Sequence, residues 1–397
     1  MKILSIEVSG FRMLGDDFKI NLVPRAKVME RDLEGEIFEI DNRLYYFSSI
    51  CFVGNNSSGK TTLLNLIYKA EKLIESGEIV YFPEDFDGDQ IHLKIYFYFN
   101  KKIYKYMCSL NRPNISINVV DDRNLCVISN EKLFCKNYAG TTKMNLLNNI
   151  DTEIFPKNKE NLSMYLSKAI AEKDGSKIPI FFPASRPNYE LLSTFLSVRN
   201  EISPELLGYL INILDDSIEI IEPLDANKYS NDDILYKFKR RGRNAKIVSI
   251  DYLLKVLSSG TIKGMLLYLY VYVALDKGCT LIVDEIERSF HKALVDNIIL
   301  LFNNSKINIH HATLIFSTHY VEIIDTIGRR DSTFVMHKNR SHISADNTYE
   351  RYKFRNEISK SRRYNSNAFD TFPNYELLMK IRNTIKDEIS KTREKVL

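Results

Sequence analysis

The sequence has few cysteines, and their arrangement argues against two kinds of site. Its five cysteines contain no C-x-x-C pair, so neither a zinc site nor a disulfide framework is supported. They are odd in number and scattered along the chain: Cys51, Cys108, Cys126, Cys135 and Cys279. Scattered thiols suit the reducing cytosol, and we therefore expect a cytoplasmic protein.

Long hydrophobic runs are also missing. No apolar stretch in the 397 residues reaches the length that spans a membrane. Residues 1–7 lack the apolar core of a signal peptide. We therefore expect no membrane partner.

The net charge and the lack of sequence repeats limit the partners and the architecture that we expect. The net charge of +4 is too small to indicate a nucleic-acid partner unless the basic residues cluster locally. No segment repeats at a fixed period, and no heptad pattern extends over several turns, so long coiled-coil arms are not expected. The hydrophobic fraction of 44% is ordinary for a soluble globular protein, and the length allows one large or two moderate domains.

A complete phosphate-loop motif, G-x-x-x-x-G-K-[ST], is the strongest signal that is present. A strand-like apolar run over 49–53 precedes it and a helical pattern follows it, which is the context that the motif needs. We expect its backbone N–H groups to bind phosphate, Lys60 to reach the outer phosphates and the Thr61 hydroxyl to ligate Mg²⁺. The alternative is a turn that matches by chance. The candidate nucleotide-binding residues are Gly54, Asn55, Asn56, Ser57, Ser58, Gly59, Lys60, Thr61 and Thr62.

Two carboxylates follow a continuous apolar run at 280–283. Such runs are typical of strands buried on both faces, and open α/β sheets bind ligands at the carboxyl ends of their strands. We expect Asp284 to hold Mg²⁺, usually through water, and Glu285 to act as the base that polarises the attacking water. Without a phosphate loop in the same chain, a solvated strand end would be an equal interpretation.

Two further features complete the pattern. His319 follows another apolar strand at 313–318, where its imidazole could bond the γ-phosphate. Ser258, Ser259 and Gly260 precede a long apolar helix at about 261–276 and offer a hydroxyl and free N–H groups to an anion. Taken alone, these three residues are an ordinary helix N-cap.

In this order and spacing, the motifs resemble those of the ABC-type ATPase superfamily, over most of residues 1–340. The resemblance implies an α/β ATPase head with a mixed or parallel core sheet flanked by helices, an antiparallel β lobe and a helical lobe. It also implies that two heads sandwich two ATP molecules. Ser258, Ser259 and Gly260 would then act in trans on the nucleotide of a second copy, in a homodimer or higher oligomer.

Two stretches of the sequence indicate which branch of the superfamily the chain resembles. The opening residues 2–12 look like the first strands of the RecF/SMC-like branch. Residues 284–291 are similar to Asp-Glu-(Leu/Ile)-(Asp/Glu)-x-Ser-(Leu/Phe)-His-Pro, a stretch of the compact (OLD/AbiL-like) AAA-family ATPases of bacterial anti-phage abortive-infection systems, and 360–369 resemble their tail. The likeness implies a nucleotide-dependent dimer switch that controls a separate effector, a nuclease or toxin.

The sequence departs from this pattern in two places. Lys292 replaces the usual proline, and no clear glutamine loop is present. Ala184-Ser185-Arg186 stands near the place where the loop is expected, whereas Gln90 comes too early to replace it. In the ABC-type superfamily, the residues that contact the nucleotide of the second copy are called the signature, which here is Leu257-Ser258-Ser259-Gly260-Thr261. Because the glutamine loop is missing and the signature ends in Thr261, we do not favour the ATPase subunit of a membrane transporter. A nucleotide scaffold that does not hydrolyse remains open until turnover is measured.

Two basic segments leave DNA binding open. Residues 236–246 hold six basic residues and no acid, and 351–364 hold six basic residues, one acid and interleaved aromatics. Such composition fits nucleic acid and would favour a RecF-like DNA-repair or DNA-end-binding ATPase, but it also fits an exposed hairpin or a partner-docking surface.

The expected organisation has three parts. Residues 1–185 form a nucleotide-binding lobe with strands at 2–9 and 18–22, a hairpin over 91–107, short strands over 115–136 and a helix at about 160–173. Residues 186–345 form a second lobe with a helical region over 189–215 and a basic hairpin over 234–250. Residues 346–397 form a basic and helical extension. Its last helix is amphipathic, with Leu378, Ile381, Ile385 and Ile389, and we expect it to pack on the core or on a second subunit.

Overall fold

The computed structural model covers the 397 residues and describes most of them. The described residues are 1–79, 83–112, 126–140, 147–154, 161–175, 177–185, 187, 190, 194, 203–223, 233–238, 244–288, 290–339, 342–352, 359–366, 369 and 375–394.

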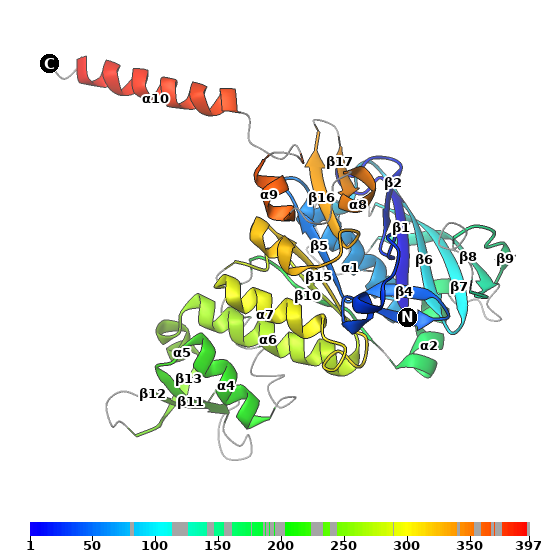
Figure 1. Ribbon diagram of the computed structural model, residues 1–397, viewed down its shortest axis with the longest axis horizontal. Helices are drawn as coiled ribbons and strands as arrows, with labels where there is room; N and C mark the ends of the chain where they lie inside the picture. Colours follow the sequence, from blue (N-terminus) through cyan, green and yellow to red (C-terminus); the bar gives the residue numbers. More distant parts are fainter. Residues whose placement is uncertain are drawn as a thin grey trace, which may run out of the picture.

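A six-stranded sheet lies at the centre of the molecule (Figure 1), in the order β10-β14-β15-β5-β16-β17. Its first five strands are parallel, and β17 is antiparallel to β16. The strands are β5 (Ser49–Val53), β10 (Ile180–Phe182), β14 (Thr280–Val283), β15 (Thr313–Thr318), β16 (Thr333–Lys338) and β17 (Ile343–Asn347).

The central strands are mostly apolar because both faces of the sheet are covered. Every residue of β5, β14 and β15 is buried. Their side chains alternate between two hydrophobic cores, as the two-residue period of a strand requires. Phe52, Ile282 and Ile315 share a core with α1 (Lys60–Ser76), whereas the residues that follow each of them share the other core with α6 (Ser259–Lys277) and α7 (Lys292–Phe302).

A second, antiparallel sheet covers the far side of α1. Its order is β2-β1-β6-β7-β8-β9, and its apolar side chains belong to the same core as those of α1, so the helix is packed between the two sheets. Its strands are β1 (Lys2–Ser9), β2 (Phe18–Asn21), β6 (Gln90–Phe99), β7 (Lys102–Asn111), β8 (Val127–Asn137) and β9 (Thr152–Glu153).

The predicted strands and hairpin of this sheet are confirmed, with one exception. Phe99 pairs with Lys102 across the turn, and both turn residues have positive φ. The prediction of several short strands over 115–136 is wrong where it can be checked. Residues 127–137 form one strand because they pair along almost the whole of β7, and 113–125 lie outside the described residues.

A helical lobe with its own small sheet lies at the lower left of Figure 1. β12 and β13 form the hairpin predicted over 234–250, and β11 adds a third strand. The basic turn 239–243 and most of the predicted helical region before 203 lie outside the described residues. The lobe contains α4 (Pro204–Leu214), β11 (Ile218–Pro223), β12 (Asp233–Phe238), β13 (Lys246–Ser249) and α5 (Ile250–Val256).

Shorter elements complete the described chain. The helix predicted at 160–173 is α2, and residues 37–47 form a two-stranded hairpin. These elements are β3 (Ile37–Asp41), β4 (Leu44–Phe47), α2 (Leu162–Asp174), α8 (Thr348–Arg351), α9 (Lys360–Asn365) and 3₁₀ helices at Glu30–Glu34, Pro83–Asp85 and Val321–Thr326.

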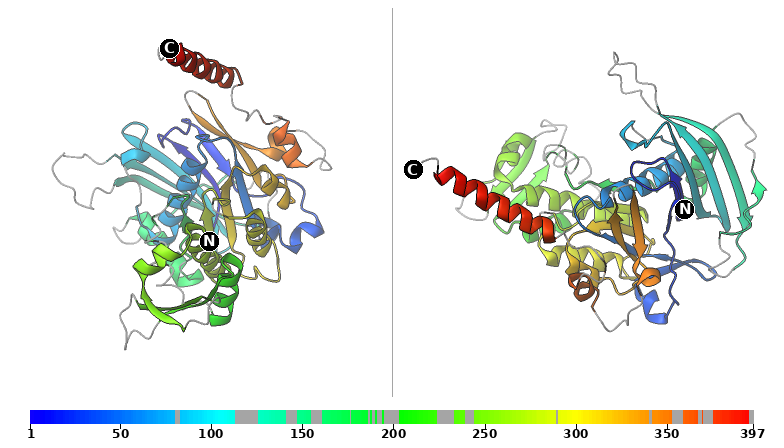
Figure 2. Two further views of the ribbon diagram at one scale, coloured as in Figure 1. Left: turned by 90° about the vertical axis from the view of Figure 1, so that its left-hand side faces the viewer. Right: turned by 90° about the horizontal axis from the view of Figure 1, so that it is seen from above.

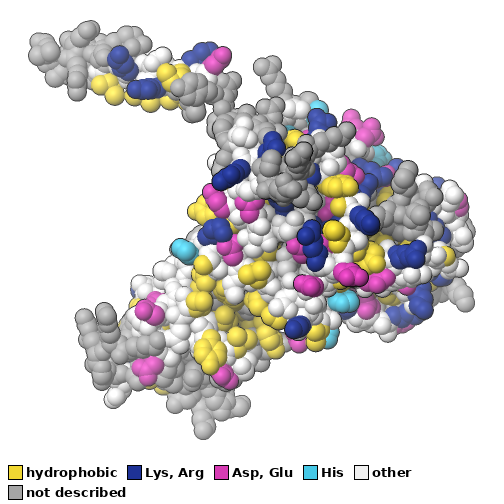
Figure 3. Space-filling model, viewed as in Figure 1, with side chains coloured by type: hydrophobic (Ala, Val, Ile, Leu, Met, Phe, Trp, Pro, Cys, Tyr) yellow, Lys and Arg dark blue, Asp and Glu magenta, His cyan; other side chains and the backbone are white. Residues whose placement is uncertain are grey.

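The C-terminal helix α10 (Tyr375–Glu394) stands away from both sheets in Figures 1 and 2. Leu377, Ile381, Ile385 and Ile389 are between 51% and 57% exposed, and Figure 3 shows hydrophobic side chains along one side of this helix. The amphipathic helix is therefore confirmed, but its predicted packing on the core is not observed. Packing on a second subunit stays a prediction.

The predicted fold class is confirmed: an α/β fold with a mixed core sheet flanked by helices, an antiparallel β lobe and a helical lobe. No long coiled coil occurs in the described residues, where the longest helix has 20 residues. Within the same residues, no helix is both long and apolar enough to cross a membrane.

Candidate nucleotide-binding site

The phosphate loop connects the carboxyl end of β5 to the first turn of α1, as its sequence predicts. Gly59 is the N-cap of α1 and has a φ of 96°, a left-handed conformation that favours glycine. A Cβ atom at this position would also lie 2.6 Å from the side chain of Ile343. The motif's second glycine is thus required by both conformation and space.

Lys60 lies at the centre of the site and is buried. Its Nζ donates hydrogen bonds to the carbonyl oxygens of Gly54 and Asn55, both at 2.9 Å. Burial lowers the pKa of Lys60 to about 8, and the nearby carboxylates of Asp284 and Glu285 oppose this shift. The ammonium is thereby held inside the loop, where phosphate oxygens would be bound.

The loop and the carboxylate strand meet through one hydrogen bond. The Thr61 hydroxyl donates to Asp284 Oδ2 at 2.7 Å, and Ser317 Oγ donates to Asp284 Oδ1 at 2.6 Å. A hydroxyl and a carboxylate are hard oxygen ligands of the kind that Mg²⁺ prefers, so this donor set fits the ion. Among the described residues, no group of three or more His, Cys, Asp and Glu side chains is placed so that it could hold a metal ion.

Glu285 has an unusual backbone. Its φ of 49° is in the left-handed region, which a non-glycine residue seldom adopts. The Ser317 hydroxyl accepts a hydrogen bond from its backbone N–H at 2.8 Å and so holds it there. Strained residues held in this way cluster at functional sites.

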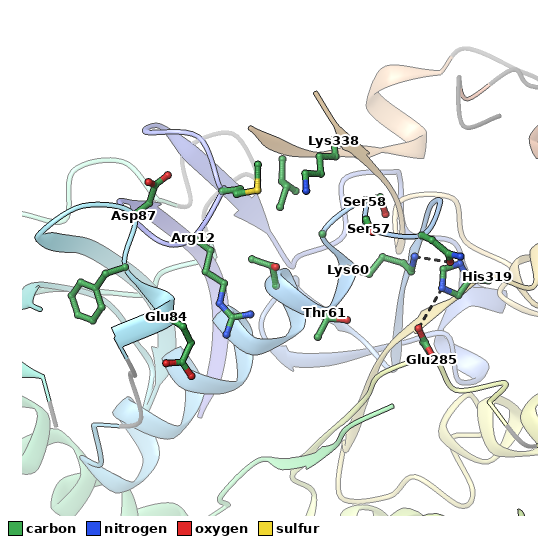
Figure 4. A pocket seen from close by; sticks show the side chains of 16 residues that line it. Arg12, Ser57, Ser58, Lys60, Thr61, Glu84, Asp87, Glu285, His319 and Lys338 are labelled. Atoms are coloured by element: carbon green, nitrogen blue, oxygen red, sulfur yellow. Dashed lines mark hydrogen bonds and ion pairs between the residues drawn. The ribbon is translucent and has the colours of Figure 1, made fainter. Parts of the chain in front are cut away.

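His319 lies between the lysine and the glutamate, as Figure 4 shows. Its Nδ1 is 3.4 Å from Lys60 Nζ, and its Nε2 is 3.6 Å from Glu285 Oε1. The structure thus brings together the four side chains that the sequence placed at the ends of two separate strands and in a loop: Lys60, Asp284, Glu285 and His319.

Glu287 belongs to the site, although the sequence analysis gave it no role. Its side chain is buried, and Oε1 accepts a hydrogen bond from the backbone N–H of His319 at 2.6 Å. Its Oε2 has no hydrogen-bond partner in the described part of the chain. An acid two residues after the carboxylate pair was the available signal, but its partner could not be known before the strands were placed side by side.

Variants of Glu287 should show whether this residue acts by positioning His319 through its hydrogen bond or only by its negative charge. Glu287→Ala leaves a buried N–H at His319 unpaired, and we expect ATP turnover to fall about ten- to a hundredfold while ATP binding is kept. Glu287→Gln keeps an oxygen acceptor and should retain most of the turnover. Steady-state kinetics and equilibrium binding measure the two quantities; equal turnover in the wild type and both variants would contradict this role.

A cavity of about 870 Å³ opens over these residues. Its lining residues include Asn56 to Thr62, Glu285, His319, Arg12, Phe86 and Lys338, and Figure 4 shows Arg12 on the other side of Thr61 from Glu285 and His319. Its volume falls within the usual range for small-molecule sites. Arg12 is held by Asp85, with its guanidinium 2.7 Å from Oδ1, and the same carboxylate also binds Lys69. Arg12 and Lys338 are further residues that the sequence analysis did not single out.

The signature residues lie elsewhere. Ser258 caps α6, and its hydroxyl accepts a hydrogen bond from the Thr261 N–H at 3.0 Å. Ser258 and Ser259 are exposed, and neither they nor Gly260 line the cavity. They therefore contribute nothing to the nucleotide site of their own chain.

The glutamine-loop positions also lie outside the cavity. Gln90 begins β6 and donates to Asn111 Oδ1 at 2.8 Å. Ala184 and Ser185 follow β10 without lining the cavity, and Arg186 lies outside the described residues.

A phosphate loop, an acidic strand end and a histidine meet at one edge of the central mixed sheet, which is the arrangement of an ATPase site. Over residues 49–325 it matches the protein family described as AAA domain, putative AbiEii toxin, Type IV TA system. The chain belongs to this family.

Two solved structures are reported for comparison. The SMC head domain from Thermotoga maritima is 11% identical, with a TM-score of 0.41 over 87% of this chain and 98% of that one. The cbiO1 protein from Clostridium perfringens, part of the ABC transporter complex cbiONQ, is 11% identical, with a TM-score of 0.32 over 93% and 96%. No curated protein matches the chain.

Proposed function

We propose that this ATPase binds ATP with Mg²⁺ and uses its hydrolysis to switch between a closed dimer and separate chains. The hydrogen bond of 2.7 Å between Thr61 and Asp284 carries the proposal, because it joins the phosphate loop to the carboxylate strand at one point. An ion bound there would contact both parts and the phosphates at once.

Each residue of the site has a role in this proposal. The loop from Gly54 to Thr62 binds the phosphates through backbone N–H groups, and Lys60 neutralises their charge. Thr61 and Asp284 hold Mg²⁺, which supplies charge neutralisation at the phosphates. Glu285 orients and polarises the attacking water as a base, and His319 contacts the γ-phosphate.

Removing the metal tests the ATPase proposal. Chelation of Mg²⁺ should abolish ATP turnover, because Lys60 and the loop N–H groups alone do not fully compensate the charge of the phosphates. Readdition of Mg²⁺ should restore turnover, and phosphate release measures both steps. Turnover that persists in excess chelator would contradict the assigned metal site, and no turnover under any condition would favour the scaffold that does not hydrolyse.

The exposed signature supports the dimer. Ser258, Ser259 and Gly260 offer a hydroxyl and helix N-terminal N–H groups at the start of a 19-residue helix, but they do not line the cavity over the phosphate loop of their own chain. In a dimer they would complete the phosphate site of the other copy. ATP would then favour the closed state, and hydrolysis would release it.

An effector under this switch is the second part of the proposal. The family description names a putative AbiEii toxin and a Type IV TA system, which supports a role in anti-phage defence with a separate nuclease or toxin as partner. Co-purification from the native cell tests it.

The RecF-like alternative depends on the two basic segments, and one of them is partly used in packing. Lys360 is buried and donates to three carbonyl oxygens, those of Ile324, Ile327 and Arg329. Tyr364 is also buried. Residues 239–243 and 353–358 lie outside the described residues, so DNA binding through 236–246 or 351–364 stays a prediction.

We further propose to keep the three-part division at 1–185, 186–345 and 346–397. The separate antiparallel sheet and the α4–β13 unit support two lobes. The central sheet contains strands from 1–185 and from 186–345. The boundary at 185 therefore divides the sequence into two parts but does not divide this sheet.

A further inference from the structure

A second cavity, of about 340 Å³, lies at the other end of α1 from the nucleotide site. The 17 residues of α1 separate the two by about 25 Å at a helical rise of ~1.5 Å per residue. The walls of this cavity come from the N-terminal side of the core sheet, the β6–β7 turn and the end of α2. Nothing in the proposed ATPase mechanism uses it.

Basic side chains from four distant parts of the chain meet at this cavity. They come from the first residues of β1, the β6–β7 turn, the last turn of α2 with the residues after it, and the loop before β15. They are Lys2, Lys101, Lys173, Lys177, His310 and His311. The fold therefore assembles a basic site that no single segment contains.

Negative charge in this wall is scarce. Asp174 is the one carboxylate among the described lining residues, and it is already paired with the Met1 ammonium at 2.6 Å and with Lys177 at 3.5 Å. Glu71 and Glu75 lie beneath, and burial raises the pKa of both, to about 7 for Glu75. They are weak counter-charges for that reason.

The cations are close enough to disfavour one another. Lys2 Nζ is fixed by the His311 carbonyl at 2.8 Å and by Thr313 Oγ1 at 3.2 Å. Burial lowers the pKa of Lys2 to about 8, with Lys177 adding to the shift. Burial likewise lowers the pKa of His311, and Lys2 and Lys177 contribute. A bound anion would relieve this repulsion.

The composition of the wall indicates the class of anion. Its described residues contain lysines and no arginine, and lysine binds phosphate as a point charge. Its volume is at the small end of the range for ligand sites, which fits a small ligand better than a folded segment.

We propose that this cavity binds a phosphate group through Lys101, Lys173 and Lys177, at a site separate from the nucleotide site. Free pyrophosphate and the terminal phosphate of a single nucleic-acid strand present the same chemistry. The proposal does not rest on the ATPase switch.

The test uses the full-length chain with Lys60→Ala, so that the phosphate loop does not contribute. Pyrophosphate is titrated calorimetrically at constant ionic strength, and 5′-phosphorylated and 5′-hydroxyl oligonucleotides are compared by fluorescence anisotropy. We expect saturable binding of one pyrophosphate per chain. Each of Lys101→Ala and Lys173→Ala should weaken it about tenfold, and the triple variant with Lys177→Ala should abolish it.

Lys132→Ala is the matched control, since Lys132 is exposed on β8 and does not line the cavity. It should leave the affinity within about twofold of the parent. A preference for the 5′-phosphorylated strand would identify a strand end as the source, and equal oligonucleotide affinities with pyrophosphate binding would identify a free anion. The proposal is overturned if no saturable pyrophosphate binding occurs, or if binding survives in the triple variant.

Discussion

The Glu285→Gln variant is expected to lose ATP turnover by about a hundred- to ten-thousandfold, the usual contribution of a general base. The substitution keeps the size of the side chain and removes the carboxylate that polarises water. Since Glu285 Oε1 lies 3.6 Å from His319 Nε2, the change acts at the point where the γ-phosphate would be contacted. ATP affinity should stay the same or rise.

Glu172→Gln is a matched control, because Glu172 is exposed on α2 and outside the cavity. Its turnover should equal that of the wild type. Phosphate release and nucleotide binding are measured in parallel. If Glu285→Gln turned over ATP at the wild-type rate, another residue would have to supply the base, and the assignment of the carboxylate pair would be wrong.

Lys60→Ala should abolish ATP binding at the concentrations used for the wild type. Removing one partner from a buried, hydrogen-bonded charge pair costs roughly 2–5 kcal/mol, or about 30- to 5,000-fold in affinity. The ammonium also donates to the carbonyl oxygens of Gly54 and Asn55, so its loss removes one hydrogen bond from each of these two loop carbonyls. Both effects weaken the loop's contact with phosphate.

Calorimetry or a fluorescent ATP analogue measures the loss, with Lys132→Ala as the control that keeps the fold and the affinity. Unfolding by heat should show that Lys60→Ala remains folded, because the glycine conformation and the α1 packing do not depend on the ammonium. Undiminished ATP affinity in Lys60→Ala would show that the cavity over the phosphate loop is not the nucleotide site.

The centre of the fold and the main site residues could be predicted because local sequence specifies them. Continuous apolar runs at 49–53, 280–283 and 313–318 are typical of strands buried on both faces, and all three are central strands. Parallel strands present their carboxyl ends at one edge, so Lys60, Asp284 and His319 had to lie close together.

What the sequence could not predict depends on contacts between distant segments. Glu287 has its role because β14 and β15 end side by side, and Arg12 faces the cavity because Asp85, 73 residues later, holds it. The basic cavity needs Lys101 and Lys173 to meet across two different elements. The position of α10 also could not be predicted. An apolar stripe shows that one face of a helix is hydrophobic, but it does not show which surface that face packs against.

The dimer switch is tested most directly by the mass of the Glu285→Gln chain in solution. Sedimentation velocity is measured without nucleotide, with ATP and Mg²⁺, and with ADP and Mg²⁺. If ATP drives dimerisation, the chain sediments slowly without nucleotide or with ADP. With ATP it sediments faster, as a dimer or a larger oligomer. Adding Ser258→Arg, which places a large charge at the exposed start of α6, should prevent the faster species while ATP still binds. If ATP leaves the sedimentation of Glu285→Gln as it is without nucleotide, the dimer switch is contradicted.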